Sequence, residues 1–473
     1  MSSESNTESL RTDGVKSAPR GFLPVLLALG PGLVLTGGVV GSGELINTPI
    51  QAAKFGFLLL WAVVVSCVIK YFLQVEFGRH CLVHNRSVFE ALNEMPGPKL
   101  ARASWLIWIF VLAWTLAQVG SAGIVGAIAG LIQRLMPSSI LESVESISST
   151  DETQTARVLA FFVVGIAMLV LWKGAYQRIE KVIVTLVVGF SVCVVIALAL
   201  LQRTGYRITA PDLASGLTFS LGDMPQEAAY AVIALMGALG VSGVELVVYP
   251  YWIREKGYAK FLGSPDSRGW RDRALGWARL LKIDAAVATI MATVITSAYF
   301  LLGAAVLFRQ GKTPEGIGVV DQISAIFTDT YGEWSRGLFV VGAFCTLFST
   351  LLAATAANSR IYTDFLATIG VIDRANEAAV RRSHWVVQTL FLLGVLSLFL
   401  LMPERPDKLV LLSHYVIGIF GTPLAIVAIC WLAFKTDSRV RMGRLGATLL
   451  LVTAGGLLLC LAVGFAFERG WIR

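Results

Sequence analysis

The chain has 473 residues, of which 56% are hydrophobic and only 15% are charged. Because a soluble domain carries about 25% charged residues, this composition excludes a soluble protein and indicates one that crosses a membrane many times. The formal net charge of +8 does not indicate nucleic-acid binding, since the basic residues lie in the gaps between apolar segments, where they orient a chain in a bilayer.

The amino-terminal residues 1–20 are polar and serine-rich and carry both signs of charge. This pattern is typical of a disordered cytoplasmic tail and not of a cleaved signal peptide. After this tail, the hydropathy of the chain predicts eleven membrane-spanning segments. They lie at about residues 22–53, 57–78, 104–132, 157–173, 180–202, 227–253, 283–308, 337–365, 385–402, 408–434 and 445–467.

The basic residues predict the orientation of these segments. A cytoplasmic amino terminus places about twice as many Lys and Arg residues in the cytoplasmic connections as in the external ones, and the loop Arg254–Lys282 is the densest. We therefore expect an integral protein of the plasma (inner) membrane, with the amino terminus in the cytoplasm and the carboxyl terminus outside.

Two of the segments contain helix-weakening residues. The first contains Gly30-Pro31-Gly32 and then Gly41-Ser-Gly-Glu44, and the sixth contains Gly237, Ser242-Gly-Val-Glu245 and Pro250. Freed backbone groups are tolerated at membrane depth only where they are buried in protein or line a wet cavity. We expect both helices to be unwound, around 41–44 and 242–245, at a binding site, although glycines can also serve close helix contacts.

The two interruptions also form an internal repeat. Shifted by 201 positions, Glu44-Leu45 matches Glu245-Leu246 and Pro49 matches Pro250. Because five spans separate the copies, the second enters from the opposite side, which predicts an all-α LeuT-type fold with an inverted repeat of five plus five helices and an eleventh helix. The expected organisation is a tail at 1–20, a transporter core at 21–435 with repeats at about 21–203 and 226–435, and a loop with the eleventh helix at 436–473.

In this fold Glu44 and Glu245 would face each other near the midplane. Two carboxylates in a dry pocket cannot both stay ionised unless a cation or a proton joins them. We therefore expect an ion site with Glu44 and Glu245 as metal ligands, although both could instead cap the half-helices that they begin. The predicted substrate site comprises Gly41, Ser42, Gly43, Glu44, Ser242, Gly243 and Glu245.

Other polar residues within the spans are weaker candidates. Lys70 and Glu76 are expected to snorkel or to pair near the cytoplasmic end of the second span. His80 and His84 have the spacing of a helical metal pair, but their basic surroundings favour a solvated face. The six cysteines form no CxxC pair and are expected to be core residues. The secondary lining candidates, each also typical of an interhelical hydrogen bond, are Gln74, Gln118, Thr346, Ser349, Asn358 and His414.

Four stretches resemble the natural resistance-associated macrophage protein (Nramp) family of divalent-metal transporters, and the likeness runs over about residues 28–435. GPGLVLTGGVVGSGE resembles the first helix of that family, and WAVVVSCVIKYFLQ with HNRSVFEAL resembles its second helix and following loop. FSTLLAATAANSRIYTDFL and LVLLSHYVIGIFGTPLAIV are similar to its eighth and tenth helices. The resemblance implies secondary-active cation transport by alternating access.

The chain departs from this family at both of its metal-binding motifs. The Asp, Pro, Gly and Asn of the DPGN motif fall on Gly41, Ser42, Gly43 and Glu44, and the MPHN motif falls on the SGVEL region, which contains neither Met nor His. Loss of the soft thioether favours a hard cation such as Mg²⁺, Mn²⁺ or Ca²⁺. The expected partners are this cation, with protons as the candidate coupling ion, and the lipid bilayer. No cofactor and no nucleic acid are expected.

Three other functions fit the sequence less well. The Gly41-Ser-Gly43 stretch also resembles the glycine motif of the amino acid-polyamine-organocation superfamily, which makes an amino-acid or organic-cation symporter the alternative, although Glu44 would repel a substrate carboxylate. A membrane receptor that does not transport is disfavoured because the chain has no soluble domain. An enzyme is disfavoured because no HExxH, GxSxG or P-loop pattern occurs.

Overall fold

The computed structural model of the chain describes residues 14–28, 41–136, 152–171, 176–239 and 243–471. These residues fold mainly into helices. The strands among them form one antiparallel hairpin, in which β1 (Lys99–Leu100) pairs with β2 (Ala103–Ser104).

Within the described residues, eight helical segments are long and apolar enough to cross a membrane. They are α5 (Leu60–His84), α7 with α8 (Trp105–Ala117 and Val119–Leu135), α10 (Glu152–Leu171), α16 with η3 (Trp270–Gly303 and Ala304–Phe308), α19 (Ser335–Thr368), α20 (Glu377–Leu401), α21 with η4 and α22 (Pro406–Val416, Ile417–Gly421 and Thr422–Lys435), and α23 (Arg444–Glu468). Each coincides with a predicted span, and the predicted fifth span falls on α11 (Tyr176–Leu201).

The first and sixth predicted spans are each divided. The first consists of α2 (Phe22–Ala28) and of η1 (Gly43–Asn47) with α4 (Thr48–Phe55), and the residues 29–40 between them lie outside the described part of the chain. The sixth consists of α13 (Pro225–Ala238) and α14 (Gly243–Glu255), and α13 ends because Leu239 is extended, with φ −84° and ψ 151°. The predicted interruption of the sixth helix is therefore confirmed.

The unwound stretches do not reach as far as predicted. Glu44 lies in the first turn of η1, and Glu245 lies inside α14, which begins at Gly243. The expectation that both glutamates sit in unwound backbone is therefore wrong. A carboxylate is stabilised at the amino-terminal end of a helix, where unsatisfied N–H groups carry partial positive charge, so each glutamate favours starting the helix before it.

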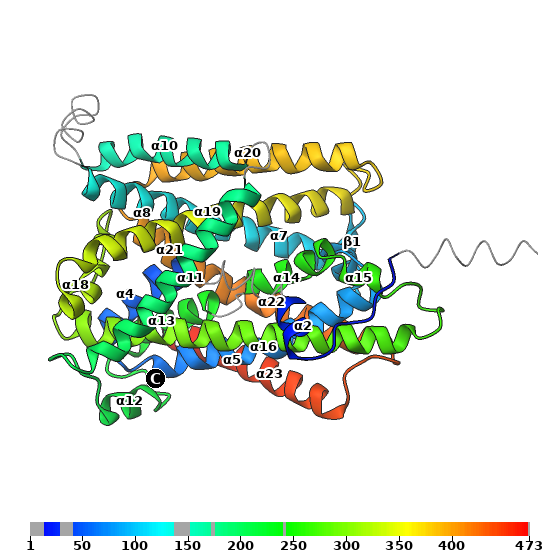
Figure 1. Cartoon of the computed structure of the whole chain (residues 1–473), viewed down its shortest axis with the longest axis horizontal. Helices are drawn as coiled ribbons and strands as arrows, with labels where there is room; N and C mark the ends of the chain where they lie inside the picture. The colour runs from blue at the N-terminus through cyan, green and yellow to red at the C-terminus, as the bar shows by residue number, and fades with distance from the viewer. Residues whose placement is uncertain (1–13, 29–40, 137–151, 172–175, 240–242, 472–473) are drawn as a thin grey trace, which may run out of the picture.

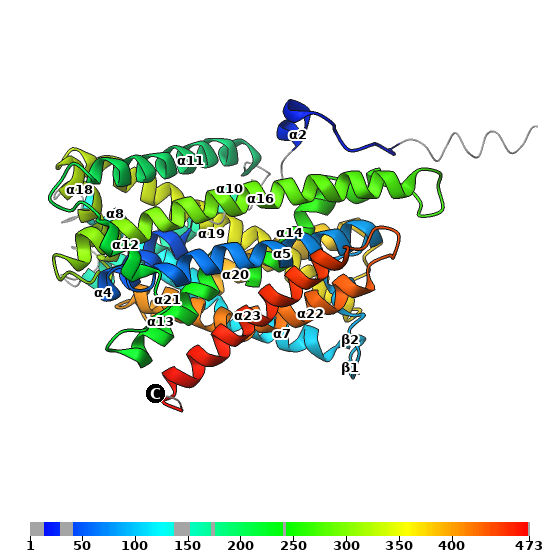
Figure 2. The same ribbon diagram turned by 90° about the horizontal axis from the view of Figure 1, so that it is seen from below.

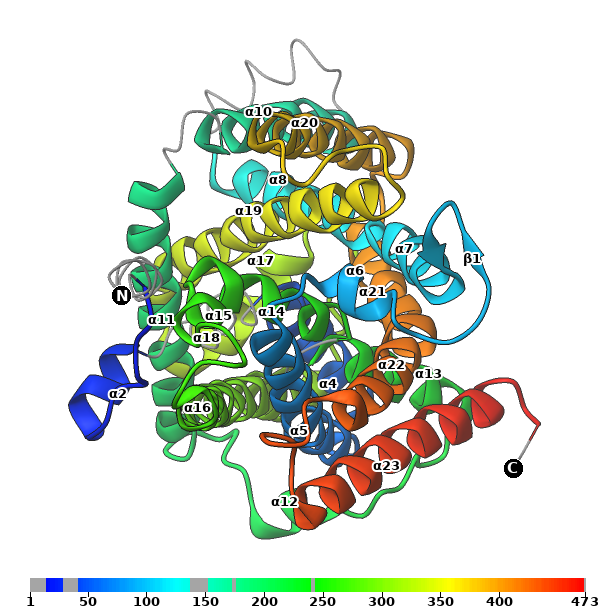
Figure 3. The ribbon, with the colours of Figure 1, turned by 90° about the vertical axis from the view of Figure 1, so that its right-hand side faces the viewer.

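The long helices run along one axis of the molecule (Figure 1). The hairpin and α15 (Tyr258–Phe261) lie toward one end, and α12 (Ala210–Gly216), α18 (Ala325–Tyr331) and the carboxyl terminus lie toward the other. Seen along the helices, α10 and α20 lie outermost on one side and α23 on the opposite side (Figure 3). Helix α23 packs against α5 and α13, as the view from below shows (Figure 2). Helices α4 and α14 thus lie inside the bundle, whereas α2 lies apart at the edge of the molecule (Figures 2 and 3).

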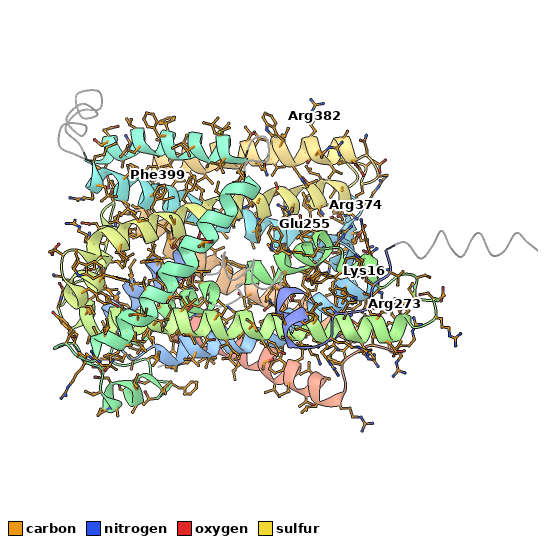
Figure 4. All side chains as sticks on the ribbon, in the orientation of Figure 1. Lys16, Glu255, Arg273, Arg374, Arg382 and Phe399 are labelled. Atoms are coloured by element: carbon orange, nitrogen blue, oxygen red, sulfur yellow. The ribbon has the colours of Figure 1, made fainter. Side chains whose placement is uncertain are left out.

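Several charged side chains lie at the end that carries the hairpin. Lys16, Glu255, Arg273 and Arg374 all lie toward it, whereas Phe399 lies toward the opposite end (Figure 4). At this end Asp364 of α19 accepts hydrogen bonds from Tyr251 Oη of α14 at 2.7 Å and from Arg374 at 2.6 Å. These bonds fix the second half of the broken sixth helix to α19.

Glycines let α13 approach its neighbours closely. A Cβ atom on Gly237 would clash with the carbonyl oxygen of His414 in α21, and one on Gly418 of η4 would lie 2.5 Å from the carbonyl oxygen of Ile233. Backbone-to-backbone contact of this kind requires residues without a side chain. Gly237, a residue of the predicted sixth-helix interruption, therefore serves a helix contact.

Candidate functional site

The two broken helices meet. A Cβ atom on Gly43, at the start of η1, would lie 3.4 Å from Cβ of Ala238, the last residue of α13, and 3.6 Å from its carbonyl oxygen. Gly41, Ser42 and Gly43 are all buried. The start of η1 and the end of α13 therefore lie in contact. That the glycine-rich stretches beside them form the substrate site stays a prediction.

Glu44 is buried at this junction, with 1% of its surface exposed. Its Oε2 accepts a hydrogen bond from the backbone N–H of Gly41 at 3.1 Å, and its Oε1 accepts one from Thr296 Oγ1 of α16 at 3.2 Å. The first bond caps the start of η1, and the second ties the carboxylate to the neighbouring helix. Both bonds hold the carboxylate in one orientation.

The helix that carries Glu44 is a π-helix. Thr48 Oγ1 donates to the carbonyl oxygen of Gly43 at 2.8 Å, Asn47 Nδ2 donates to the carbonyl oxygen of Ala234 in α13 at 3.4 Å, and Gln51 Nε2 donates to Asn47 Oδ1 at 3.2 Å. Short π-helical turns are frequent at functional sites. Sequence reasoning missed Asn47 and Gln51, although they follow Glu44 at the one-turn spacing that places side chains on one face.

Further polar groups surround the carboxylate. Tyr299 is fully buried one turn beyond Thr296, within electrostatic range of Glu44, and its hydroxyl has no hydrogen-bond partner among the described residues. Cys67 of α5 interacts with Thr296 and lies within electrostatic range of both Glu44 and Lys70. Thr296 therefore contacts the carboxylate directly, and Tyr299 and Cys67 lie within electrostatic range of it.

Lys70 lies inside the protein and not at its surface. It is fully buried, and its Nζ donates to the carbonyl oxygens of Met236 at 2.6 Å and Leu239 at 2.7 Å and to Ser66 Oγ at 3.1 Å. The expectation that Lys70 snorkels or pairs with Glu76 is wrong, because Glu76 pairs with Arg79 at 3.0 Å. The carbonyl groups at the end of α13 carry partial negative charge, which attracts the ammonium group.

Two of the secondary candidates lie near Lys70. Gln74 follows Lys70 by one turn on the same face of α5 and is fully buried, and neither atom of its amide has a partner among the described residues. His414 of α21 is 9% exposed and within electrostatic range of Lys70, and its Nδ1 also lacks a partner in that part of the chain. Both have polar groups left over for a ligand or water.

Comparison with known proteins decides the family. Residues 32–468 match the family model described as natural resistance-associated macrophage protein-like. The chain belongs to the Nramp family. Its relatives include two proteins named divalent metal cation transporter MntH. The one from Xanthomonas campestris is 24% identical over 96% of this chain and 93% of its own length, and the one from Mycobacterium tuberculosis is 26% identical over 84% and 81%.

Solved structures establish the fold of this Nramp protein. A manganese transporter from Eremococcus coleocola superposes with a TM-score of 0.63 at 14% identity, covering 96% of this chain and 90% of the other. MhsT in complex with L-phenylalanine superposes with a TM-score of 0.61 at 15% identity, covering 96% and 100%. The LeuT-type fold predicted from the sequence is confirmed.

Among the remaining lining candidates of this Nramp protein, Asn358 and Gln118 form a hydrogen bond between helices, whereas Ser349 bonds within α19. Asn358 Nδ2 of α19 donates to Gln118 Oε1 at 3.0 Å, and Trp114 Nε1 donates to Asn358 Oδ1 at 2.6 Å. Ser349 Oγ donates to the carbonyl oxygen of Thr346, whose own buried hydroxyl lacks a partner among the described residues. The contacts of Gln118 and Asn358 therefore favour a role in holding helices together, and that of Ser349 a role within its own helix, over a role in lining the substrate site.

One member of the histidine pair is buried, whereas His84 is partly exposed. His80 is 1% exposed, and its Nδ1 lies 3.1 Å from Thr436 Oγ1, so the expectation of a solvent-facing His80 is wrong. Within the described ranges, no three His, Cys, Asp or Glu residues come together as metal ligands. Cys67, Cys81 and Cys345 are free and buried, as expected for core residues.

Part of the predicted site on the sixth helix lies outside the described residues. This holds for Ser242 and for the side chain of Glu245, whereas Gly243 begins α14. That Glu245 faces Glu44 stays a prediction.

Proposed function

We propose that this Nramp protein is a secondary-active transporter that carries a divalent cation by alternating access, with Glu44 in the substrate site. The observation that carries the proposal is a buried carboxylate at the junction of two broken helices in a chain of this family. An ionisable group at membrane depth is costly to insert and is by default functional. The relatives named divalent metal cation transporters support the choice of substrate class.

The groups around Glu44 favour a hard cation. The carboxylate, Thr296 Oγ1 and the Tyr299 hydroxyl are oxygen donors, and oxygen ligands suit Mg²⁺, Mn²⁺ and Ca²⁺ better than softer metals. We propose Glu245 as the second carboxylate of the site. Backbone carbonyls freed at the helix breaks would supply further oxygen atoms.

The carboxylate can hold a cation without giving up its structural bonds. Each carboxylate oxygen has two lone pairs, so the single bonds from Thr296 to Oε1 and from Gly41 to Oε2 do not by themselves prevent either oxygen from coordinating a metal ion. Helix η1 begins and α13 ends at the junction, so the halves of the broken helices can tilt about it and open the site to either side. Protons are the candidate coupling ion.

An amino-acid or organic-cation symporter is not favoured. The family match covers residues 32–468, whereas the likeness to MhsT is a likeness of fold. A buried Glu44 would also repel the carboxylate of an amino acid.

Transport by purified protein in liposomes tests the proposal. Liposomes containing a fluorescent indicator of divalent cations should report uptake of Mn²⁺, Mg²⁺ or Ca²⁺ above the rate in protein-free liposomes, and an imposed proton gradient tests coupling. Radiolabelled amino acids, assayed in the same liposomes, should not accumulate. Amino-acid uptake without any cation uptake would overturn the proposal in favour of the symporter.

A further inference from the structure

Among the described residues, three oxygen atoms from α5 and the end of α13 accept hydrogen bonds from the ammonium group of Lys70. Two are the carbonyl oxygens of Met236 and Leu239, at 2.6 and 2.7 Å from Nζ, and the third is Ser66 Oγ, at 3.1 Å. An ammonium group has three N–H donors. Distances of 2.6–2.7 Å are those of charge-assisted hydrogen bonds. We call these three oxygens the α13 cage.

The cage exists because the sixth helix is broken. In a continuous helix the carbonyl groups of Met236 and Leu239 would accept bonds from the next turn, but Leu239 is extended and α13 ends at Ala238. The same serine hydroxyl also lies 3.1 Å from the Leu239 carbonyl oxygen, to which it donates. The end of α13 therefore concentrates carbonyl oxygens at a place that water does not reach.

We propose that the α13 cage is a monovalent-cation site, with a preference for primary ammonium ions, that the protein fills with its own Lys70. The ligand class follows from the geometry, since an ammonium group offers separate N–H donors to the three oxygens. The lysine stem is fully buried along α5, one turn from Ser66, so the chain brings the cation into the cage from a fixed direction.

The occupied cage has a consequence for transport that rests on the proposed function. The positive charge of the ammonium group would repel a divalent cation from the cage. The cation would therefore bind on the side of the junction where Glu44 lies. Lys70 would thus limit the junction to one exchangeable cation. Occupancy of the cage itself does not depend on what the protein transports.

Chemical complementation of Lys70→Ala tests the site. This substitution removes the atoms from Cγ to Nζ, which together have the size of n-propylammonium. We expect the melting temperature of purified Lys70→Ala to fall by roughly 5 °C, because the cage carbonyls lose their donor. We expect n-propylammonium to restore it in a saturable manner and to leave the wild-type protein unchanged.

Two controls separate charge from volume. The alcohol n-propanol has the same length without the positive charge and should not restore Lys70→Ala. Lys70→Met keeps an apolar stem in the space, so it should melt below the wild type and should not respond to n-propylammonium. The readout is the stability of the purified protein, so a failure of the transport proposal would not affect it.

Three results would overturn the inference. They are a Lys70→Ala protein that melts like the wild type, equal restoration by n-propanol, and no response of a folded Lys70→Ala protein to n-propylammonium. If Lys70→Ala does not fold, Lys70→Met decides the question, because a melting temperature at or above that of the wild type would show that the cage needs no cation.

Discussion

Glu44 has two tasks that one carboxylate can perform together. Its Oε2 caps η1 through Gly41, and its Oε1 accepts from Thr296. The sequence offers helix capping and ion binding as competing explanations of this residue. The geometry makes them compatible, because the capping bond orients the same carboxylate that would bind a cation.

The donor set around Glu44 predicts the metal preference. We expect Mg²⁺, Mn²⁺ or Ca²⁺ to be preferred over Zn²⁺ and Cd²⁺, because the groups next to Glu44 are mainly oxygen donors. Competition for uptake in liposomes measures this order. Among the described residues, the thiol of Cys67 is a soft group within electrostatic range of Glu44. Because Cd²⁺ prefers sulfur ligands, any inhibition by Cd²⁺ should be lost in Cys67→Ala. Cd²⁺ preference that persists in Cys67→Ala would contradict the assignment of the ligands.

The two glutamates are predicted to act as a unit. If Glu44 and Glu245 bind one cation, Glu44→Gln and Glu245→Gln should each weaken Mn²⁺ binding by about tenfold or more, and the double substitution should cost little more than the worse single one. Titration calorimetry on the four proteins measures this. Strictly additive losses would mean that the two residues bind separately, and normal binding in Glu245→Gln would remove it from the site.

Residues differ in how far the sequence reveals them. Glu44 stands out because a carboxylate is rare in a span. Thr296 and Tyr299 do not, because hydroxyl groups are common in membrane helices as interhelical hydrogen bonds. Lys70 is visible, but its partners are backbone carbonyls, which no sequence pattern marks. Its burial could be inferred only by knowing that α13 ends beside it.

At the scale of helices, glycine and proline predict where a helix is interrupted but not where it resumes. The sixth helix breaks after Ala238, close to the predicted place. Helices η1 and α14 nevertheless begin at or before the glutamates, because acidic side chains stabilise a first turn. The glycines on α8 do not interrupt the helix but allow close packing. Gly120, Gly123 and Gly126 all approach α21 or the residues flanking it.

The packing of α13 predicts a large effect of one methyl group. Gly237→Ala would place Cβ against the carbonyl oxygen of His414, a backbone atom that cannot move without shifting α21. We expect a loss of about 1–3 kcal/mol in stability, measured as a lower melting temperature of the purified protein.

Gly455→Ala is the matched control for this substitution. Gly455 lies within α23, and a Cβ atom there would meet no atom within 4 Å. Since alanine favours a helix over glycine by about 1 kcal/mol, Gly455→Ala should melt at or above the wild-type temperature. Equal melting of Gly237→Ala and wild type would contradict the close contact between α13 and α21.

At the scale of the whole molecule, the hydropathy of the sequence is enough to predict most of the membrane-spanning helices. Apolar runs such as Leu60–His84 predict their helices directly, because lipid leaves a spanning segment no other way to satisfy its backbone. The repeat of Glu44-Leu45 and Pro49 at Glu245-Leu246 and Pro250 predicts the LeuT-type arrangement. The contacts between helices, such as Gly237 against His414, depend on tertiary packing that periodicity does not encode.

Cysteine labelling in intact cells tests the orientation. Lys312 and Glu377 are exposed and lie in connections that the positive-inside rule assigns to opposite sides. We expect a membrane-impermeant maleimide to label Lys312→Cys in intact cells and Glu377→Cys only after the membrane is opened. The wild-type protein controls for its own cysteines. The reverse pattern would contradict a cytoplasmic amino terminus.

The most direct measurement of the central claim is Mn²⁺ uptake by liposomes containing wild-type protein or Glu44→Gln, beside Thr296→Val. Thr296→Val removes one hydrogen bond to the carboxylate but keeps its charge. We expect the wild type to take up Mn²⁺, Glu44→Gln to lose at least nine-tenths of the initial rate, since removal of a charged partner costs about 1.5–3 kcal/mol, and Thr296→Val to keep most of it. Wild-type uptake by a folded Glu44→Gln protein would contradict the claim that Glu44 binds the transported cation.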